Sequence, residues 1–371
     1  MQGGRKSVGV LALAVEFPGV VRTNDYYRKK FPEVYASAEQ RGLAKLWGGG
    51  PKGGDRVGEL FDEEMAPYLS DVFRGTVERR LLAPGETVLD VELRAARAAL
   101  AAARLEPEAI DLLISATFIR DHVGIGHSAY VAGALGYTGS GWNFESACSS
   151  SLEALRVASG LVRAGEHERV LVVTSCMYSK VSDERDTQSW FLGDGAAAFV
   201  VGEVEEGFGV LGAHSLNTAN TCGSIWYEIS SDPATPPIVA RTNKTAGKVF
   251  RESCTQFLEP CTDGALERAG VKRDDVDFFI FNTPNAWFAK FAARVLGVDP
   301  ERTISSYPEV ANVGPALMPA NLHQAAREKR LKKGDLVLAY TLGSVASAGA
   351  VVMRWGDVAL APAPAPGTIR Q

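Results

Sequence analysis

A self-similarity at a fixed spacing is the feature of this 371-residue sequence that most restricts how the chain can fold. Residues 99–118 and residues 265–284 each read as the end of an amphipathic helix, a polar turn and an apolar strand. The offset that places position 265 on position 99 also places the apolar run 336–340 on 170–174. Two matches in the same order favour an internal duplication over the chance likeness that all βα units share.

The two halves of the repeat predict an α/β fold with alternating strands and helices. Their apolar runs are continuous rather than alternating, as in strands that are buried on both faces of a mostly parallel sheet. We expect residues 1–205 to form one half and residues 206–357 to form the other. The tail 358–371 contains an Ala-Pro repeat, which predicts a disordered segment.

One stretch, at about residues 24–72, has no counterpart in the second half and is interpreted as an inserted region. Within it, the glycine-rich segment 47–55 lacks the Lys-Ser/Thr pair of a phosphate-binding loop. The segment is either a plain surface loop or a lid near a substrate entrance.

The overall charge and the cysteine pattern exclude several classes of protein. A net charge of −5 gives no electrostatic reason to expect nucleic acid or an anionic membrane as partner. The apolar run 7–15 is too short to span a bilayer and lacks a cleavage site, so we expect a first strand and a cytoplasmic protein. The five cysteines form neither a dense disulfide framework nor a Cys-x-x-Cys motif, so no structural metal is expected.

Cys148 lies between small residues just before an apolar-periodic helix pattern. Ser149 to Ser151 are predicted to cap that helix. A thiol at a helix N-terminus meets unpaired N–H groups and the positive end of the dipole, which favours its thiolate. The alternative is a buried structural cysteine.

Three segments, in this order and spacing, resemble β-ketoacyl-ACP synthase III: Ser-Ala-Cys-Ser-Ser-Ser-Leu at 146–152, Val-Leu-Val-Val-Thr-Ser at 170–175, and Phe-Leu-Gly-Asp-Gly-Ala-Ala-Ala at 191–198. Further segments that agree are 246–250, 281–285 and 311–314, and the likeness covers about residues 7–356. The resemblance implies the five-layered αβαβα thiolase fold, built from two duplicated α/β halves. It also implies a homodimer, an acyl thioester on Cys148, and no cofactor beyond the acyl-CoA or acyl-phosphopantetheine substrate. Asp194 matches a family signature and is interpreted as a structural residue.

The departure from the family pattern is at Asn282. The family has His-Gln-Ala-Asn at this place, whose His, with a second Asn, polarises a thioester carbonyl during decarboxylative condensation; here the segment is Asn-Thr-Pro-Asn. The second Asn is matched by Asn312, whose distance along the chain from Asn282 agrees with the family spacing. Asn282 can donate a hydrogen bond to an oxyanion but cannot accept a proton at neutral pH. We therefore expect Cys148, Asn282 and Asn312 to retain carbonyl recognition and to be impaired in decarboxylation.

Other candidate site residues follow from the same resemblance. The backbone N–H of Ser344 is the expected second donor of an oxyanion hole. Asn285 and Trp287 are candidate substrate-binding residues, although the family has a basic residue where Trp287 stands. His127 is the candidate base, with a structural histidine as the alternative.

Two further patterns lie outside these motifs. His167 and His323 are interpreted as surface residues. The basic run 327–333 either docks an acidic carrier protein or complements the C-terminal end of a helix.

The leading functional hypothesis is an acyltransferase of specialised metabolism, such as antibiotic or polyketide assembly. It would load an acyl group from acyl carrier protein or acyl-CoA onto Cys148 and pass it to a small-molecule acceptor, at a hydroxyl or an amine, or to a second carrier thiol. The alternatives are a decarboxylating synthase that forms a carbon–carbon bond and a non-catalytic partner subunit that binds carriers. The acyl group, the acceptor and the choice between the two donors are open.

Overall fold

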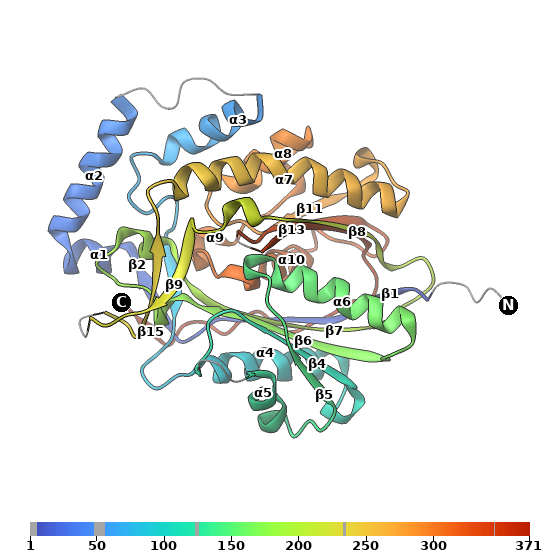
Figure 1. Ribbon diagram of the computed structural model, residues 1–371. Coiled ribbons are helices and arrows are strands. Elements are labelled where there is room, and N and C mark those ends of the chain that lie inside the picture. The colour runs from blue at the N-terminus through green and yellow to red at the C-terminus, as the bar shows by residue number, and fades with distance from the viewer. Residues whose placement is uncertain (1–5, 48–55, 123–125, 233–234, 345) are drawn as a thin grey trace.

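The computed structural model describes residues 6–47, 56–122, 126–232, 235–344 and 346–371. Each half of the chain contributes one large sheet (Figure 1). The first has the strand order β14 (Ala359–Leu360), β1 (Val8–Glu16), β7 (Asp194–Glu203), β6 (Arg169–Met177), β4 (Leu112–Thr117) and β5 (Ser140–Asn143). The second has the order β11 (Phe278–Phe281), β12 (Leu336–Leu342), β13 (Ser347–Arg354) and β8 (Gly209–Asn217).

The predicted repeat is visible in the pairing of these strands. In the first sheet β4 pairs parallel with β6, β6 pairs antiparallel with β7, and β7 pairs antiparallel with β1. In the second sheet β11, β12, β13 and β8 pair in the same order and with the same directions. Leu112 is the partner of Val170, and Phe278 is the partner of Val337. The first strand therefore repeats at the offset that the sequence comparison gave, whereas the second strand is displaced by one further position.

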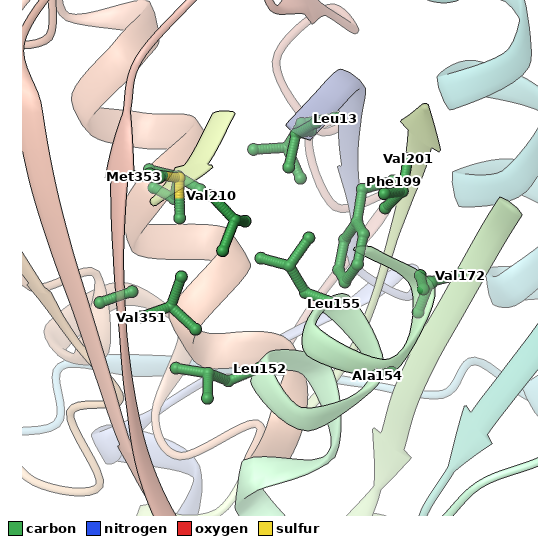
Figure 2. Packing of buried hydrophobic residues seen from close by; sticks show 14 of the residues in the cluster. Leu13, Leu152, Ala154, Leu155, Val172, Phe199, Val201, Val210, Val351 and Met353 are labelled. Carbon is green, nitrogen blue, oxygen red and sulfur yellow. The ribbon is translucent and has the colours of Figure 1, made fainter. Parts of the chain in front are cut away.

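Two helices lie between the sheets, α6 (Ser150–Ala164) and α10 (Leu317–Arg327). Figure 2 shows Leu152 and Leu155 of α6 packed between Phe199 of the first sheet and Val351 of the second. The outer face of the first sheet is covered by α4 (Val88–Ala103) and α5 (Ser128–Leu135), and that of the second by α7 (Ala246–Ala269) and α8 (Phe288–Leu296) (Figure 1). The five layers predicted from the sequence are thus helix, sheet, helix, sheet and helix.

The two central helices begin at the same place in the molecule. A 3₁₀ turn, η3 (Ala147–Ser149), leads into α6, and an equivalent turn of the second half, η9 (Gly314–Ala316), leads into α10. The first residue of each turn has a left-handed backbone, with φ of 48° at Ala147 and 57° at Gly314. The two turns contact each other. The duplication therefore brings two helix N-termini, with their unpaired N–H groups, to one point between the sheets.

The inserted region packs against both halves, with residues 24–47 beside residues 20–23 and 187–191 of the first half and residues 56–65 outside the second. It contains α1 (Asn24–Lys30), α2 (Pro32–Trp47), α3 (Arg56–Met65) and η1 (Ala66–Tyr68). Ion pairs tie α3 to the outer helices, from Asp62 to Arg251 at 2.9 Å and from Glu63 to Arg294 at 2.8 Å. The glycine-rich segment lies outside the described residues from position 48 to 55, so the surface-loop and lid hypotheses both stay hypotheses.

Two small sheets complete the architecture. One contains β2 (Val20–Thr23), β3 (Glu78–Leu81) and β15 (Ile369–Arg370), and the other is a hairpin of β9 (Ile225–Ile229) and β10 (Ile238–Thr242). Within the described ranges, no helix combines the length and the apolar character that crossing a membrane requires.

The prediction of a disordered tail is wrong. Its residues add β14 to the edge of β1, with Ala359 opposite Ala12, and β15 to the edge of β2, with Ile369 opposite Val20. Ala361 between them is buried, and its N–H donates to the carbonyl of Leu13 at 3.0 Å. An Ala-Pro composition does not reveal that two strand edges elsewhere in the chain offer unpaired backbone groups.

The tail also explains a second wrong expectation. His323, interpreted as a surface residue, is buried on α10, and its Nε2 lies 3.1 Å from the carbonyl oxygen of Ala361. Burial lowers the pKa of this imidazole. The hydrogen-bonding partner, Ala361, belongs to the tail. Because the tail was expected to be disordered, the sequence offered no partner that could bury His323.

Candidate active site

Cys148, the candidate nucleophile, is the middle residue of η3 and is partly exposed between two buried neighbours. Its Sγ lies 3.8 Å from the hydroxyl of Tyr178. Tyr178 begins η4 (Tyr178–Lys180) directly after β6. Sequence reasoning missed this tyrosine, although its place at the carboxyl end of a parallel strand, where α/β proteins carry their sites, was a usable signal.

The electrostatic surroundings of Cys148 differ from those expected at a helix end. Burial raises the pKa of its thiol, and the Glu145 carboxylate raises it further. The hydrogen bond with Tyr178 lowers this pKa, but by less than burial raises it. The prediction that the helix N-terminus favours the thiolate therefore gave the wrong direction for the net effect, because it left desolvation out.

Ser146 and Ser149, on either side of Cys148, link the two halves. Ser149 is the N-cap residue, but its side chain makes no capping hydrogen bond. Its Oγ donates to the carbonyl of Ser347 at 2.7 Å and accepts from the hydroxyl of Thr341 at 2.9 Å. The hydroxyls of Ser146 and Ser347 lie 2.6 Å apart. The nucleophile turn is thus fastened to the connection between β12 and β13.

That connection approaches the nucleophile turn closely at Gly343. A Cβ at this position would lie 2.5 Å from the carbonyl oxygen of Ser146 and 3.1 Å from the backbone nitrogen of Ser149. Ser344 follows in the same turn, and Val345 lies outside the described residues. The position of Ser344 is compatible with the expected oxyanion-hole donor, which stays a prediction.

Asn282 lies beside the nucleophile, as the resemblance implied. It follows β11, and its backbone N–H donates to the carbonyl of Tyr340 at 2.9 Å. Its side chain is only 3% exposed, and Nδ2 donates to the carbonyl oxygen of Cys148 at 3.3 Å. Its Oδ1 has no hydrogen-bond partner within the described part of the chain. The turn after β11 is held by Asn321 of α10, whose Nδ2 donates to the carbonyl of Phe281 at 2.8 Å.

Asn312 lies just before η9, which contacts the nucleophile turn. Its Oδ1 accepts from the N–H of Gly314 at 2.9 Å. Its backbone carbonyl accepts from the N–H of Gly193 at 2.9 Å. With the amide oxygen engaged, the NH₂ group is the end of the side chain that is available to a carbonyl.

Asn285 and Trp287 are buried in the turn that follows Asn282. The ring of Trp287 packs against Phe61 and Tyr68 of the inserted region, with ring centroids 6.3 and 5.7 Å away. Trp287 Nε1 and Asn285 Oδ1 are both buried and lack a partner among the described residues. These two groups could meet a polar ligand, and their role in substrate binding stays a prediction.

His127 is placed as a structural residue would be. It is 2% exposed, and its Nε2 lies 2.5 Å from Oε2 of Glu92 on α4. The other carboxylate oxygen of Glu92 accepts from the hydroxyl of Ser175 at 2.6 Å. Among the described residues, the side chain that hydrogen-bonds with the Cys148 sulfur is Tyr178. The geometry therefore supports the structural interpretation of His127 over the base.

The basic run 327–333 is largely engaged within the chain. The Nη1 of Arg327 donates to the carbonyl of Ala361 at 3.2 Å. Lys333 pairs with Glu205 at 2.8 Å and with Asp357 at 2.6 Å. Because α10 ends at Arg327, these contacts favour a local structural role over carrier docking.

Asp194 supports the tyrosine beside the nucleophile. Its carboxylate is buried and accepts from the N–H of Ser179 and from that of Leu82, each at 2.9 Å. Burial raises its pKa to about 6. By holding Ser179, the carboxylate fixes the turn that carries Tyr178. Asp194 is therefore a structural residue, as expected, and the structure that it stabilises is part of the site.

Two cavities between the described residues lie away from Cys148. One, of about 470 Å³, is bounded by α6, β8 and α7 and is lined by Arg156 and Arg268; the other, of about 450 Å³, is bounded by α1 and the C-terminal residues. The arginines of the first are already hydrogen-bonded to Ser215 and to the carbonyl of Ala213. In the described ranges no group of three or more His, Cys, Asp or Glu side chains is arranged to hold a metal ion.

Comparison with known proteins agrees with this architecture. Residues 143–219 match the family described as 3-oxoacyl-[acyl-carrier-protein] synthase III, and residues 266–355 match its C-terminal domain. The β-ketoacyl-[acyl-carrier-protein] synthase III of Agrobacterium fabrum is 30% identical over 287 residues, which cover 76% of this chain and 88% of the relative. The synthase III of Desulfitobacterium hafniense is 31% identical over 313 residues, covering 81% and 94%.

Solved structures give the same fold. The synthase III of Aquifex aeolicus superposes with a TM-score of 0.76 at 24% identity, covering 94% of this chain and all of that one. A substituted variant of OleA from Xanthomonas campestris superposes with a TM-score of 0.75 at 22% identity, covering 95% and 99%. With its fold, its duplicated halves and these relatives in agreement, the chain belongs to the β-ketoacyl-[acyl-carrier-protein] synthase III family of thiolase-fold enzymes.

Proposed function

We propose that this protein is an acyltransferase that takes an acyl group from acyl carrier protein or acyl-CoA onto Cys148 as a thioester. It then passes the group to a hydroxyl, an amine or a second carrier thiol in specialised metabolism. The observation that carries the proposal is the contact of Asn282, at the family's histidine position, with the carbonyl oxygen of Cys148 at 3.3 Å. An amide at this place can orient and polarise a carbonyl but cannot exchange protons as imidazole does.

The proposed reaction has two steps. In the first, the Cys148 sulfur attacks the donor carbonyl, which the NH₂ group of Asn282 polarises. The developing oxyanion accepts from this group and from the backbone N–H groups of Cys148 and Ser344. The donor thiol leaves, and the acyl group stays on Cys148. In the second, the acceptor forms a bond to the thioester carbonyl carbon and gives up its proton to water, while the bond from that carbon to the Cys148 sulfur breaks and the thiol takes up a proton again. The NH₂ groups of Asn282 and Asn312 hold the incoming substrate. Both amides are neutral donors, which suits positioning more than proton transfer.

A decarboxylating condensation is the second candidate, and the relatives named β-ketoacyl-[acyl-carrier-protein] synthase III favour it. In that reaction Asn282 and Asn312 would stabilise the enolate oxygen formed from a malonyl thioester. The two candidates share the first step and differ in the release of carbon dioxide.

Intact-protein mass spectrometry after incubation with acyl-CoA and acyl-carrier donors is expected to show an increase equal to one acyl group. The Cys148→Ala variant is expected to show none, because the nucleophile is gone. Labelled malonyl thioester is expected to release no carbon dioxide. Release at the rate of transfer would favour the condensing candidate, and the absence of any adduct on the unchanged protein would favour a non-catalytic carrier-binding subunit.

We also propose that two copies of the chain pair through β5. This strand is the edge of the first sheet, and all four of its residues are exposed. Trp142 on it is 42% exposed, an unusual position for a large apolar side chain at an open strand edge. Sedimentation of the unchanged protein is expected to give the mass of two chains, and Trp142→Lys to shift it toward one. A single-chain mass for both proteins would contradict the pairing.

A further inference from the structure

Tyr178 presents the side-chain hydroxyl nearest to the reacting atom in the described contacts, with its Oη 3.8 Å from Cys148 Sγ. The tyrosine is buried, and its ring packs edge-on against Phe118 at 6.2 Å. Ile119 and Val181 belong to the same apolar cluster. In such surroundings a hydroxyl gains most from polarisable groups within reach, and the sulfurs of Cys148 and Cys176 both lie beside it.

The hydroxyl is held in place from two sides. On one side Asp194 accepts from the backbone N–H of Ser179 at 2.9 Å and also from its hydroxyl, which fixes the turn that begins at Tyr178. On the other side η9 packs against the phenol, since a Cβ added at Gly314 would lie 3.4 Å from Tyr178 Oη and 2.9 Å from the Cβ of Cys176. The phenol therefore has little room to turn away from the sulfur.

We propose that Tyr178 is a catalytic residue, whose hydroxyl donates a hydrogen bond to the Cys148 sulfur and stabilises the thiolate that attacks the donor thioester. The assignment rests on the proposed acyl transfer through Cys148. In the part of the chain that the structure describes, no imidazole contacts the Cys148 sulfur, and this assignment supplies a group that activates the nucleophile.

The step balances without a further reactant. Cys148 loses its proton to water, and its sulfur forms a bond to the donor carbonyl carbon while the bond from that carbon to the donor sulfur breaks. The departing thiolate takes up one proton from water. Tyr178 keeps its own proton throughout, because burial raises the pKa of its phenol well above the ordinary value.

The ionisation of Cys148 is governed by few groups. The pKa of the thiol is raised by burial, raised by the Glu145 carboxylate and lowered by the Tyr178 hydroxyl. From the other elements Cys176 and Tyr227 face the same region, and burial raises the pKa of each well above its ordinary value, so both are neutral near pH 7. Removal of the Tyr178 hydroxyl must therefore raise the pKa of Cys148, and neutralisation of Glu145 must lower it.

The test is the rate of alkylation by iodoacetamide across pH 6–10, followed at Cys148 by peptide mass spectrometry on the native full-length protein. Tyr178→Phe is expected to shift the rate profile to higher pH and to slow alkylation at pH 7.5 by about tenfold, the effect of losing a hydrogen bond to a charged group. Glu145→Gln is expected to shift it to lower pH. Exposed Cys222 serves as the internal reference and should react alike in every variant.

Tyr137→Phe is the matched control. It also removes the hydroxyl of a buried tyrosine, one that donates to the carbonyl of Ser140 at 2.8 Å. This variant should leave the Cys148 profile unchanged. Ser179→Ala, which removes one bond to Asp194 and keeps the phenol, should give a smaller shift in the direction of Tyr178→Phe and keeps the proposal testable should Tyr178→Phe not fold.

Acyl loading supplies the second readout. Tyr178→Phe is expected to lower kcat for thioester formation by about tenfold with little change in KM, because the hydroxyl touches the nucleophile. If the unchanged protein loads acyl groups but Tyr178→Phe matches it in both readouts, the role of Tyr178 is overturned and the acyltransferase proposal stands. If no donor forms an adduct while Tyr178→Phe still shifts alkylation, the acyltransferase proposal fails and only the effect on the thiol remains.

Discussion

Asn282→Ala is expected to slow thioester formation on Cys148 by about 10²- to 10³-fold, the usual cost of losing a donor that stabilises a developing oxyanion. The Asn282 side chain is 3% exposed, and its amide donates to the carbonyl oxygen of Cys148, so its removal also deletes a contact between the turn after β11 and the nucleophile turn. Asn282→His is expected to retain loading and to release carbon dioxide from a malonyl thioester, because imidazole restores the group that the family pattern has at this place.

Stopped-time intact mass spectrometry measures the loading, and capture of labelled carbon dioxide measures the decarboxylation. Asn220→Ala is the control, since this exposed amide donates to the side chain of Gln256 at 2.8 Å and its loss should leave both readouts unchanged. Equal loading by Asn282→Ala and the unchanged protein would remove Asn282 from the catalytic set. Decarboxylation by the unchanged protein, at the rate of Asn282→His, would show that asparagine suffices for condensation.

Gly343→Ala is expected to lower the free energy of unfolding by about 1–3 kcal/mol, the range for overpacking a tight contact. It should also slow loading by about 10²-fold, the scale of a displacement near 1 Å at a catalytic site. The added Cβ would lie 2.5 Å from the carbonyl oxygen of Ser146 and 2.9 Å from that of Ser347. Both are backbone atoms, so no side-chain rotation relieves the contact. The turn that carries Ser344 must then move away from Cys148.

Urea unfolding and the loading assay check this result. Gly160→Ala is the matched control, because this glycine lies inside α6 with no atom within 4 Å of an added Cβ. In a helix interior that change should stabilise the protein by up to about 1 kcal/mol. If Gly343→Ala were as stable and as active as Gly160→Ala, the close packing of the two halves at Gly343 would not matter for the site.

The fold was predictable because duplication leaves a long-range signal in a single sequence. Two apolar strands at one offset predicted two duplicated α/β halves, and the family resemblance implied the five layers. The pairing of Phe278 with Val337 corrects the offset of the second strand by a single position. The same regularity places η3 and η9 at equivalent positions. A comparison of the two halves does not predict which residues of one half contact the other. In this protein those contacts determine the surroundings of Cys148.

The wrong and missed expectations share this cause. Tyr178 stands 30 residues after Cys148 and reaches it only because β6 returns to the same edge of the sheet. Ser149 has the local chemistry of a helix cap, but Ser347 of the other half competes successfully for its hydroxyl. The pKa of Cys148 was judged from a helix end alone, whereas burial by distant segments decides its direction. Each error concerns a contact between residues that are far apart in the sequence.

The pairing of the tail has a consequence for the order in which the protein can be completed. Arg22, in β2, donates to the side chain of Gln371, and these two residues are 349 positions apart. During synthesis β1 and β2 emerge long before β14 and β15, and their outer edges stay unpaired until those two strands have left the ribosome. Closing so long a loop is slow compared with forming the local βα units. The edges of these two early strands therefore stay open while most of the two halves forms, and the emergence of β14 and β15 is the event that protects them.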